Sequence, residues 1–208
     1  MTTLDIFADP VCPWCLIGKV ELDRALESRP NHPFQIAWHP FRLNPQFPRG
    51  GMDRGDYLRQ KFGDGAEQMM QPVAERAAAL GLKLGPVARQ PDTTDAHRLM
   101  HWAGIEAAQS RVMAGLLRAH WQDSRDIGDA EVLADIAAGA GMNREVTARL
   151  LASDADIDTI NTRESHARER GINSVPTFIV ADRHAVSGAQ PAALWQRVID
   201  ELTPAQGS

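Results

Sequence analysis

Strand-like segments occur only near the two ends of this 208-residue chain, and a long helical stretch separates them. Between Asp56 and Arg170, apolar residues recur with the period of an α-helix, as at Leu99, Met100 and Ala103. Glycines interrupt this pattern at intervals, which predicts five or six helices and no strand. The chain is therefore expected to run β-α-β, then a block of helices, then β-β-α.

The N-terminal end has about the size of one β-α-β unit. Leu4 to Ala8 is a short apolar run, which predicts a buried strand. A helix is expected to begin near Pro13 and to end at Pro30. The segment from Phe34 to Trp38 then predicts a second strand.

The C-terminal end predicts a hairpin followed by a helix. Residues 176–180 are rich in β-branched and aromatic side chains, and residues 184–187 are expected to pair back on them after a short turn. Residues 188–190 open the last helix, with Pro191 in its first turn. Within the whole chain, only residues 203–208 are expected to be disordered.

Composition and charge exclude several classes of function. The formal net charge is −5, and the shares of hydrophobic and charged residues are those of a soluble globular protein. Lys and Arg are spread through the chain, which argues against nucleic acid and against an anionic membrane surface as partners. No apolar run approaches the roughly 20 residues of a membrane-spanning helix, and the first residues lack the features of a signal peptide. We therefore expect a cytoplasmic protein.

The chain has two cysteines, Cys12 and Cys15, at the junction of the first strand and the first helix. Two cysteines this close together exclude a framework of structural disulfides. In the cytosol, such a Cys-X-X-Cys pair is more often redox-active or metal-binding. Pro13 suits the first position of a helix, which makes Cys12 the N-cap residue and Cys15 the third helical residue.

The predicted N-cap position makes the two sulfurs unequal. The Cys12 sulfur is expected to face the unpaired N–H groups and the positive dipole end of the helix, which favour thiolate over thiol. Such a setting typically lowers a cysteine pKa from about 8.5 into the range of about 3.5–7.5. Cys12 is therefore predicted to attack disulfides, and Cys15, one turn deeper and buried, to resolve the mixed disulfide.

Two other interpretations of the cysteine pair are weaker. The spacing is either a coincidence of two helical cysteines or half of a zinc site, with His97 and His101 as the other ligands. The stiff and bulky Pro13-Trp14 pair disfavours a metal knuckle, so we expect no bound metal and no bound cofactor. His97 and His101 are then expected to be core or interface histidines.

A combination of motifs spreads over nearly the whole chain: DPVCPWC at 9–15 with IGK at 17–19, WHPFRLNP at 38–45, DTTDAHRL at 92–99, and GINSVPTF at 171–178 with GAQ at 188–190. Together they resemble the DsbA family, and most closely its cytoplasmic FrnE-like branch, which includes 2-hydroxychromene-2-carboxylate isomerase-like proteins. The resemblance implies an α/β thioredoxin fold made from residues 1–47 and 171–208. A large all-helical insertion domain, residues 48–170, interrupts that fold.

The resemblance also implies a set of site residues. Pro176 is expected to follow a cis peptide bond and to lie beside the Cys12 sulfur, which accounts for a proline at the start of a central strand. The backbone of Val175 is expected to pair with bound peptide or glutathione. Gly188, Ala189 and Gln190 are expected near the site, where the N–H groups of the following helix would hold a carboxylate. A further candidate for substrate contact is Asn44.

Five other residues have predicted roles of different weight. Trp14, with Pro13, is expected to line an exposed apolar patch for substrates. Asp9 either assists proton transfer to or from Cys15 or is a turn or capping residue. The pair Met69 and Met70 is expected to serve helix packing.

These features favour a thiol–disulfide oxidoreductase that exchanges disulfides with peptides, proteins or glutathione, with glutathione as a candidate co-substrate. The first alternative is a glutathione-dependent isomerase or transferase of the 2-hydroxychromene-2-carboxylate isomerase or kappa type. Those relatives carry a serine in place of Cys12, so the cysteine pair argues against them. The second alternative is a non-catalytic partner- or metal-binding module. Because relatives dimerise, the resemblance also allows a homodimer.

Overall fold

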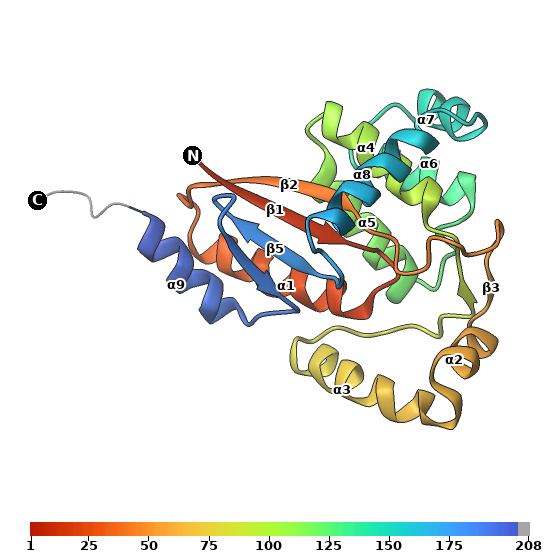
Figure 1. The fold of residues 1–208 in the computed structure, drawn as a ribbon, viewed down its shortest axis with the longest axis horizontal. Helices are drawn as coiled ribbons and strands as arrows, with labels where there is room; N and C mark the ends of the chain where they lie inside the picture. Colours follow the sequence, from red (N-terminus) through yellow and green to blue (C-terminus); the bar gives the residue numbers. More distant parts are fainter. Residues whose placement is uncertain (204–208) are drawn as a thin grey trace, which may run out of the picture.

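The computed structural model describes residues 1–203; residues 204–208, most of the tail predicted to be disordered, lie outside the described residues. Both ends of the chain contribute to one four-stranded sheet (Figure 1). Its strands, in the order β2-β1-β5-β6, are β1 (Thr2–Ala8), β2 (Phe34–Pro40), β5 (Thr177–Val180) and β6 (His184–Ser187). Strands β1 and β2 are parallel, whereas β5 is antiparallel to both of its neighbours.

Two helices, α1 (Pro13–Ser28) and α9 (Ala192–Leu202), pack side by side along this sheet (Figure 1). Phe178 of β5 contacts Trp195 of α9, with 4.7 Å between the ring centroids. Both side chains are fully buried. Burial of this apolar surface holds the C-terminal helix on the strands that precede it.

The segment between β2 and β5 is mainly helical. It contains β3 (Met52–Asp53), α2 (Arg54–Phe62), the short 3₁₀ turn η1 (Gly63–Gly65), α3 (Ala66–Ala79), β4 (Arg89–Gln90), α4 (Thr94–Ile105), α5 (Gln109–Trp121), α6 (Ala130–Gly139), α7 (Arg144–Leu151) and α8 (Ile157–Glu169). It thus has seven α-helices instead of five or six, and the antiparallel pairing of β3 with β4 departs from the expected absence of strands. Strands of two residues show no alternation that a sequence pattern would reveal.

The helices of this segment form two groups (Figure 1). Helices α4, α5 and α8 pack against β2, while α3 contacts α1 near the start of the sheet's first crossover. The chain therefore brings α2 and α3 close to the beginning of α1. Within residues 1–203, no helix combines the length and the apolar character that a membrane span requires.

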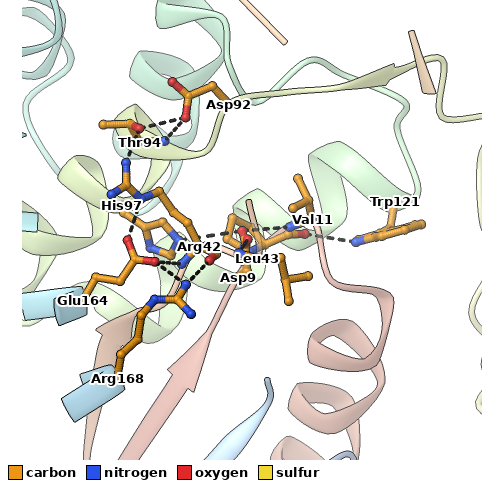
Figure 2. A network of polar contacts seen from close by, with 11 residues as sticks. Asp9, Val11, Arg42, Leu43, Asp92, Thr94, His97, Trp121, Glu164 and Arg168 are labelled. Carbon is orange, nitrogen blue, oxygen red and sulfur yellow. Dashed lines mark hydrogen bonds and ion pairs between the residues drawn. The ribbon is translucent and has the colours of Figure 1, made fainter. Parts of the chain in front are cut away.

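A buried polar cluster joins the sheet to the helical segment. Glu164 of α8 accepts a hydrogen bond from Nε of Arg42 at 2.7 Å and another from Arg168 at 2.7 Å. The Arg42 guanidinium also donates to Thr94 and Asn161. Figure 2 shows Glu164 between the two guanidinium groups, just beyond the end of β2. Both charges of the Arg42–Glu164 pair are thus matched inside the chain.

Candidate functional site

Strand pairing brings the two distant motifs together. Phe7 of β1 lies opposite Thr177 of β5, so the loop after β1 lies beside the residues that precede β5. The Val175–Pro176 peptide bond in that segment is cis. Sγ of Cys12 lies 3.5 Å from the carbonyl oxygen of Val175, to which the thiol donates a hydrogen bond.

A glycine on α1 allows close packing around this proline. A Cβ atom on Gly18 would lie 3.1 Å from Cγ of Pro176 and 3.5 Å from Cα of Ala189. The N–H of Gly188 donates to the Pro176 carbonyl at 2.8 Å, and Gly188 has a φ of 78°, a conformation that favours glycine. The 188–190 turn therefore lies against Pro176 and α1.

Cys12 is the N-cap residue of α1, with φ −85° and ψ 118°, but its sulfur makes no cap hydrogen bond. The pKa of Cys12 is nevertheless lowered, chiefly by the hydrogen bond from the Cys15 thiol. Main-chain N–H groups of Cys15 and Trp14 lower this pKa further, against the opposing effects of burial and of the Asp9 charge. The Cys15 thiol is thus the first cause of the lowered Cys12 pKa, and the first-turn N–H groups invoked from the sequence add to it.

Cys15 differs from Cys12 in the direction of its pKa shift. Burial raises its pKa well above the ordinary value, and its hydrogen bond to Cys12 and the Cys12 charge act in the same direction. Both cysteines are free, and Cys15 is the more deeply buried of the two. The reduced pair therefore has one sulfur suited to be a thiolate and one suited to remain a thiol.

Asp9 holds the loop between β1 and Cys12 in place. Its carboxylate accepts a hydrogen bond from the N–H of Leu43 at 2.8 Å and a longer one from the N–H of Val11 at 3.5 Å. Nε2 of His97 lies 3.7 Å from the same carboxylate and makes no hydrogen bond with a described residue. Figure 2 shows these groups meeting beneath the loop. The geometry thus gives Asp9 the turn-fixing role, and proton transfer to Cys15 stays a prediction.

The two histidines considered as metal ligands have different surroundings. His97 faces Asp9, whereas Nδ1 of His101 lies 3.2 Å from a guanidinium nitrogen of Arg163. Among residues 1–203, no group of three or more His, Cys, Asp or Glu side chains is arranged to hold a metal ion. The two cysteines and these two histidines are therefore not brought together.

A cavity of about 220 Å³ opens beside Cys12, between the start of α1 and the α2–α3 pair. Pro13 and Trp14 line it, and Trp14 is 37% exposed. Met69 and Met70 line it too, and Met70 also packs against the hydrophobic core, as the expected role in helix packing requires. The remaining lining residues are Val11, Cys12, Leu43, Arg54, Tyr57, Leu58, Lys61, Phe62, Val73 and Gln90.

Asn44 lies outside this cavity. It lines a neighbouring one of about 380 Å³, and its side-chain amide donates to the Tyr57 hydroxyl at 3.2 Å. Tyr57 and Lys61 line both cavities. Asn44 therefore contacts Tyr57, a residue that lines the cavity beside Cys12, but does not line that cavity itself.

An internal carboxylate occupies one N–H group at the start of α9. The N–H of Ala192 donates to Oε2 of Glu21 at 2.8 Å, and Glu21 is buried. Gln190 turns its side-chain amide to the carbonyl of Ser187. Binding of a substrate carboxylate by the 188–190 turn stays a prediction.

The residues that sequence reasoning missed come from α2, α3 and β4, mainly Arg54, Lys61 and Gln90. Nothing in their local pattern separates them from an ordinary helical surface. One signal was available: α2 follows soon after β2, whose end lies beside the end of β1 and therefore close to Cys12. Only the packing of α3 against α1 shows which side chains reach the cavity.

Fold and site together define a thioredoxin-fold protein with a Cys-X-X-Cys pair and a cis-proline beside it. The chain belongs to the DSBA-like thioredoxin domain family, whose model matches residues 3–200. The predicted fold, a thioredoxin core with a helical insertion, is thereby confirmed.

Solved structures show the same architecture. The probable DsbA oxidoreductase SCO1869 from Streptomyces coelicolor superposes with a TM-score of 0.86 at 28% identity, over 100% of this chain and 94% of that one. The cytosolic disulfide reductase DsbM from Pseudomonas aeruginosa, solved with GSH, gives 0.67 at 20% identity, over 96% and 98%. A 2-hydroxychromene-2-carboxylate isomerase gives 0.73 at 15% identity, over 96% and 95%. The last two comparisons show likeness of fold alone.

Proposed function

We propose that this protein is a thiol–disulfide oxidoreductase that exchanges disulfides with peptides, proteins or glutathione through Cys12 and Cys15. The observation that carries the proposal is the inequality of the two sulfurs. Cys12 lines a cavity and has a lowered pKa, whereas Cys15 is buried, has a raised pKa and donates its proton in a hydrogen bond to Cys12. A thiolate that a substrate reaches and a protonated thiol behind it are the two parts that exchange requires.

The proposed reaction has two steps. In the first, the Cys12 thiolate attacks one sulfur of a substrate disulfide; a Cys12–S–S–R bond forms, and the other substrate sulfur leaves as a thiolate that takes a proton from solvent. In the second, Cys15 gives up its proton and its sulfur attacks Cys12, which forms the Cys12–Cys15 disulfide and releases the second substrate thiol. The substrate gains two electrons and the protein loses two. Run backwards, the same steps oxidise a substrate dithiol.

The surroundings of Cys12 supply places for a bound substrate. The Val175 main chain lies next to the Cys12 sulfur, and Pro176 holds that segment against α1. On the other side, Pro13 and Trp14 border the cavity. We infer that a substrate chain lies along Val175 while its side chains contact Trp14.

Glutathione and a cytoplasmic location belong to this proposal as well. The DsbM structure contains GSH and that protein is described as cytosolic, which supports testing glutathione disulfides first. The isomerase alternative has a fold-level likeness in its favour, but the dithiol at Cys12 and Cys15 favours exchange. A homodimer stays a prediction, which sedimentation analysis tests.

The experiment compares the wild type with Cys12→Ser and Cys15→Ser. Reduced wild-type protein is expected to reduce insulin or a glutathionylated peptide, Cys12→Ser to lose this activity, and Cys15→Ser to accumulate the mixed disulfide. Alkylation of Cys12 with iodoacetamide is expected to show a pH midpoint below about 8.5. Equal exchange by wild type and Cys12→Ser would refute the proposal. Fast glutathione-dependent isomerisation of a chromene carboxylate would favour the isomerase instead.

A further inference from the structure

Arg163 joins three elements of the fold at one point. Helix α8 packs against β2 and α4 (Figure 1). One terminal nitrogen of Arg163 lies 3.2 Å from Nδ1 of His101 on α4, and the other lies 3.4 Å from Nδ1 of His39 on β2. Within residues 1–203, no carboxylate oxygen lies within 4.0 Å of these nitrogens. Two histidine rings therefore bind this guanidinium, in the place where an acidic side chain is usual.

The two histidines have the same arrangement. Nε2 of His39 lies 2.6 Å from a carboxylate oxygen of Asp5, and Nε2 of His101 lies 3.8 Å from one of Asp156. Each ring thus has a carboxylate at Nε2 and the guanidinium at Nδ1. An arginine has donors and no acceptor, so each contact with Arg163 is a hydrogen bond only while Nδ1 has no proton. The arrangement therefore requires two neutral rings whose single proton is on Nε2.

A proton on His39 breaks one of its contacts and keeps the other. Nδ1 then becomes a donor, and the ring carries a positive charge that faces another positive charge. Nε2 donates to Asp5 in both protonation states, and the Phe7 ring stacks on His39 with 4.8 Å between the ring centroids. The ring is thus held in place, so Arg163 is the group that moves away.

Charged groups from several segments face the two rings. They are Asp5 of β1, Asp156 at the start of α8, Arg163 within α8, and Arg170 just after α8. Burial is the first cause of the lowered pKa of His39; the two arginines act in the same direction, and Asp5 opposes them. Since the ordinary pKa is 6.5, the folded protein takes up this proton only at a lower pH.

We propose that Arg163, His39 and His101 form a proton-sensitive clamp, which joins α8 to β2 and α4 while both rings are neutral and opens when either ring takes up a proton. Both terminal nitrogens belong to one planar group, so movement away from one ring also breaks the contact with the other. Glu164 keeps its contact with Arg42, so α8 stays in place and only its attachment weakens. The clamp is independent of the proposed disulfide exchange.

Nuclear magnetic resonance of the histidine rings tests the protonation states. At pH 7.5, the ring nitrogen shifts of His39 and His101 are expected to show Nε2 with a proton and Nδ1 without one. Arg163→Met is expected to raise the affinity of His39 for a proton about tenfold, because the ring loses a hydrogen bond that only its neutral form accepts.

Arg170→Met is the control for this measurement. Arg170 is exposed and acts on His39 through its charge alone, so the proton affinity is expected to change less than about threefold. A proton on Nδ1 of either ring at pH 7.5, or equal effects of the two arginine substitutions, would overturn the proposal.

Hydrogen exchange of the α8 amides tests the attachment of the helix. The amides of α9, which packs on α1, are the internal reference. After correction for the intrinsic pH dependence of exchange, wild-type protection in α8 is expected to fall about tenfold more than in α9 between pH 7.5 and 5.5. A tenfold change is the usual worth of one or two hydrogen bonds.

A double variant removes the titration and keeps the acceptors. In His39→Asn/His101→Asn, each amide oxygen takes the place of Nδ1 and still accepts from Arg163, but it binds no proton. The protection of α8 relative to α9 is then expected to be independent of pH. His166→Asn is the matched control, because His166 is exposed on α8 itself; it is expected to keep the wild-type pH dependence. Both wild-type measurements stand without the double variant. If α8 shows no extra loss in the wild type, or the same loss in the double variant, the clamp is wrong.

Discussion

Two buried arginines have opposite surroundings. Arg42 follows β2 directly, and Arg54 is the first residue of α2. Arg42 contacts Glu164, and its remaining donors reach Thr94 and Asn161 (Figure 2). The Arg54 guanidinium donates to Gln90 and lies over the Trp121 ring, and no carboxylate among the described residues pairs with it. The two positions are equally buried, each with 8% of its surface exposed.

This difference distinguishes a buried charge that the chain neutralises from one that it does not. A buried charge that the chain neutralises fixes elements relative to one another, and its removal leaves the partner charge unmatched. A buried charge that the chain leaves unmatched raises the free energy of the folded protein. The comparison therefore predicts that the two sites respond differently to substitution.

The largest effect is expected at the matched site. Glu164→Ala leaves Arg42 buried without its carboxylate and frees Arg168, which also donates to the Arg42 carbonyl. The free energy of unfolding is expected to fall by about 3–5 kcal/mol. Denaturation with urea, monitored by circular dichroism, measures this change.

An exposed cluster of the same composition serves as control. Asp135 lies between Arg125 and Arg144 on the protein surface, where solvent screens the charges. Asp135→Ala is expected to change the unfolding free energy little. If the two substitutions cost the same, the buried cluster has no special structural role.

The second effect concerns His120, which lies next to Arg54. The folded protein binds a proton at His120 only near pH 3, since burial and the Arg54 charge lower this pKa while Asp9 raises it. The unfolded chain binds that proton near pH 6.5. As the pH falls from 6.5, the unfolded state therefore takes up more protons, and folding stability is lost. Between pH 6.5 and 5, His120 is expected to account for about 2 kcal/mol of this loss.

His120→Leu removes the titrating group and keeps an apolar side chain of similar size. Its unfolding free energy is expected to fall less than that of the wild type over the same pH interval. Urea denaturation at pH 6.5, 5.75 and 5 measures the difference between the two slopes. Parallel slopes would mean that His120 is not held neutral in the folded protein.

Local sequence signals were sufficient for much of the architecture and for the cysteine pair. The short apolar run before Asp9 predicted β1, and Pro13 predicted where α1 begins. These signals act within a few residues, so they can be interpreted without knowledge of the tertiary structure. The inequality of Cys12 and Cys15 followed from the same local rule, although the hydrogen bond from Cys15 is the first cause of the lowered Cys12 pKa and burial is the first cause of the raised Cys15 pKa.

The cavity beside Cys12 was beyond such reasoning, because it depends on contacts between distant segments. Met69 reaches it because α3 packs against α1, and Arg54 lies there beside Gln90 of β4, which is far away in sequence. The contact of Glu21 with the start of α9 has the same cause, since Glu21 is far away in sequence from Ala192, to which it binds. Whether a charge or a helix end is available to a ligand depends on which other side chain arrives there in the fold.

The smallest change in unfolding free energy is expected for Arg54, whose charge the chain does not neutralise. A small change is what distinguishes Arg54 from a neutralised arginine such as Arg42. Arg54→Met loses the hydrogen bond to Gln90 and the contact with the Trp121 ring, but it also removes a buried charge that the chain does not neutralise. These terms oppose each other, so the unfolding free energy is expected to change by no more than about 1 kcal/mol. The control is Arg98→Met, because Arg98 is also buried, with 1% of its surface exposed, but pairs with Asp95 and donates to three main-chain carbonyls, those of Leu150, Ser153 and Ala155. That variant is expected to lose several times more stability in the same urea titration. If Arg54→Met destabilises the protein as much as Arg98→Met does, Arg54 is a structural residue, and the distinction between the two kinds of buried charge fails in this protein.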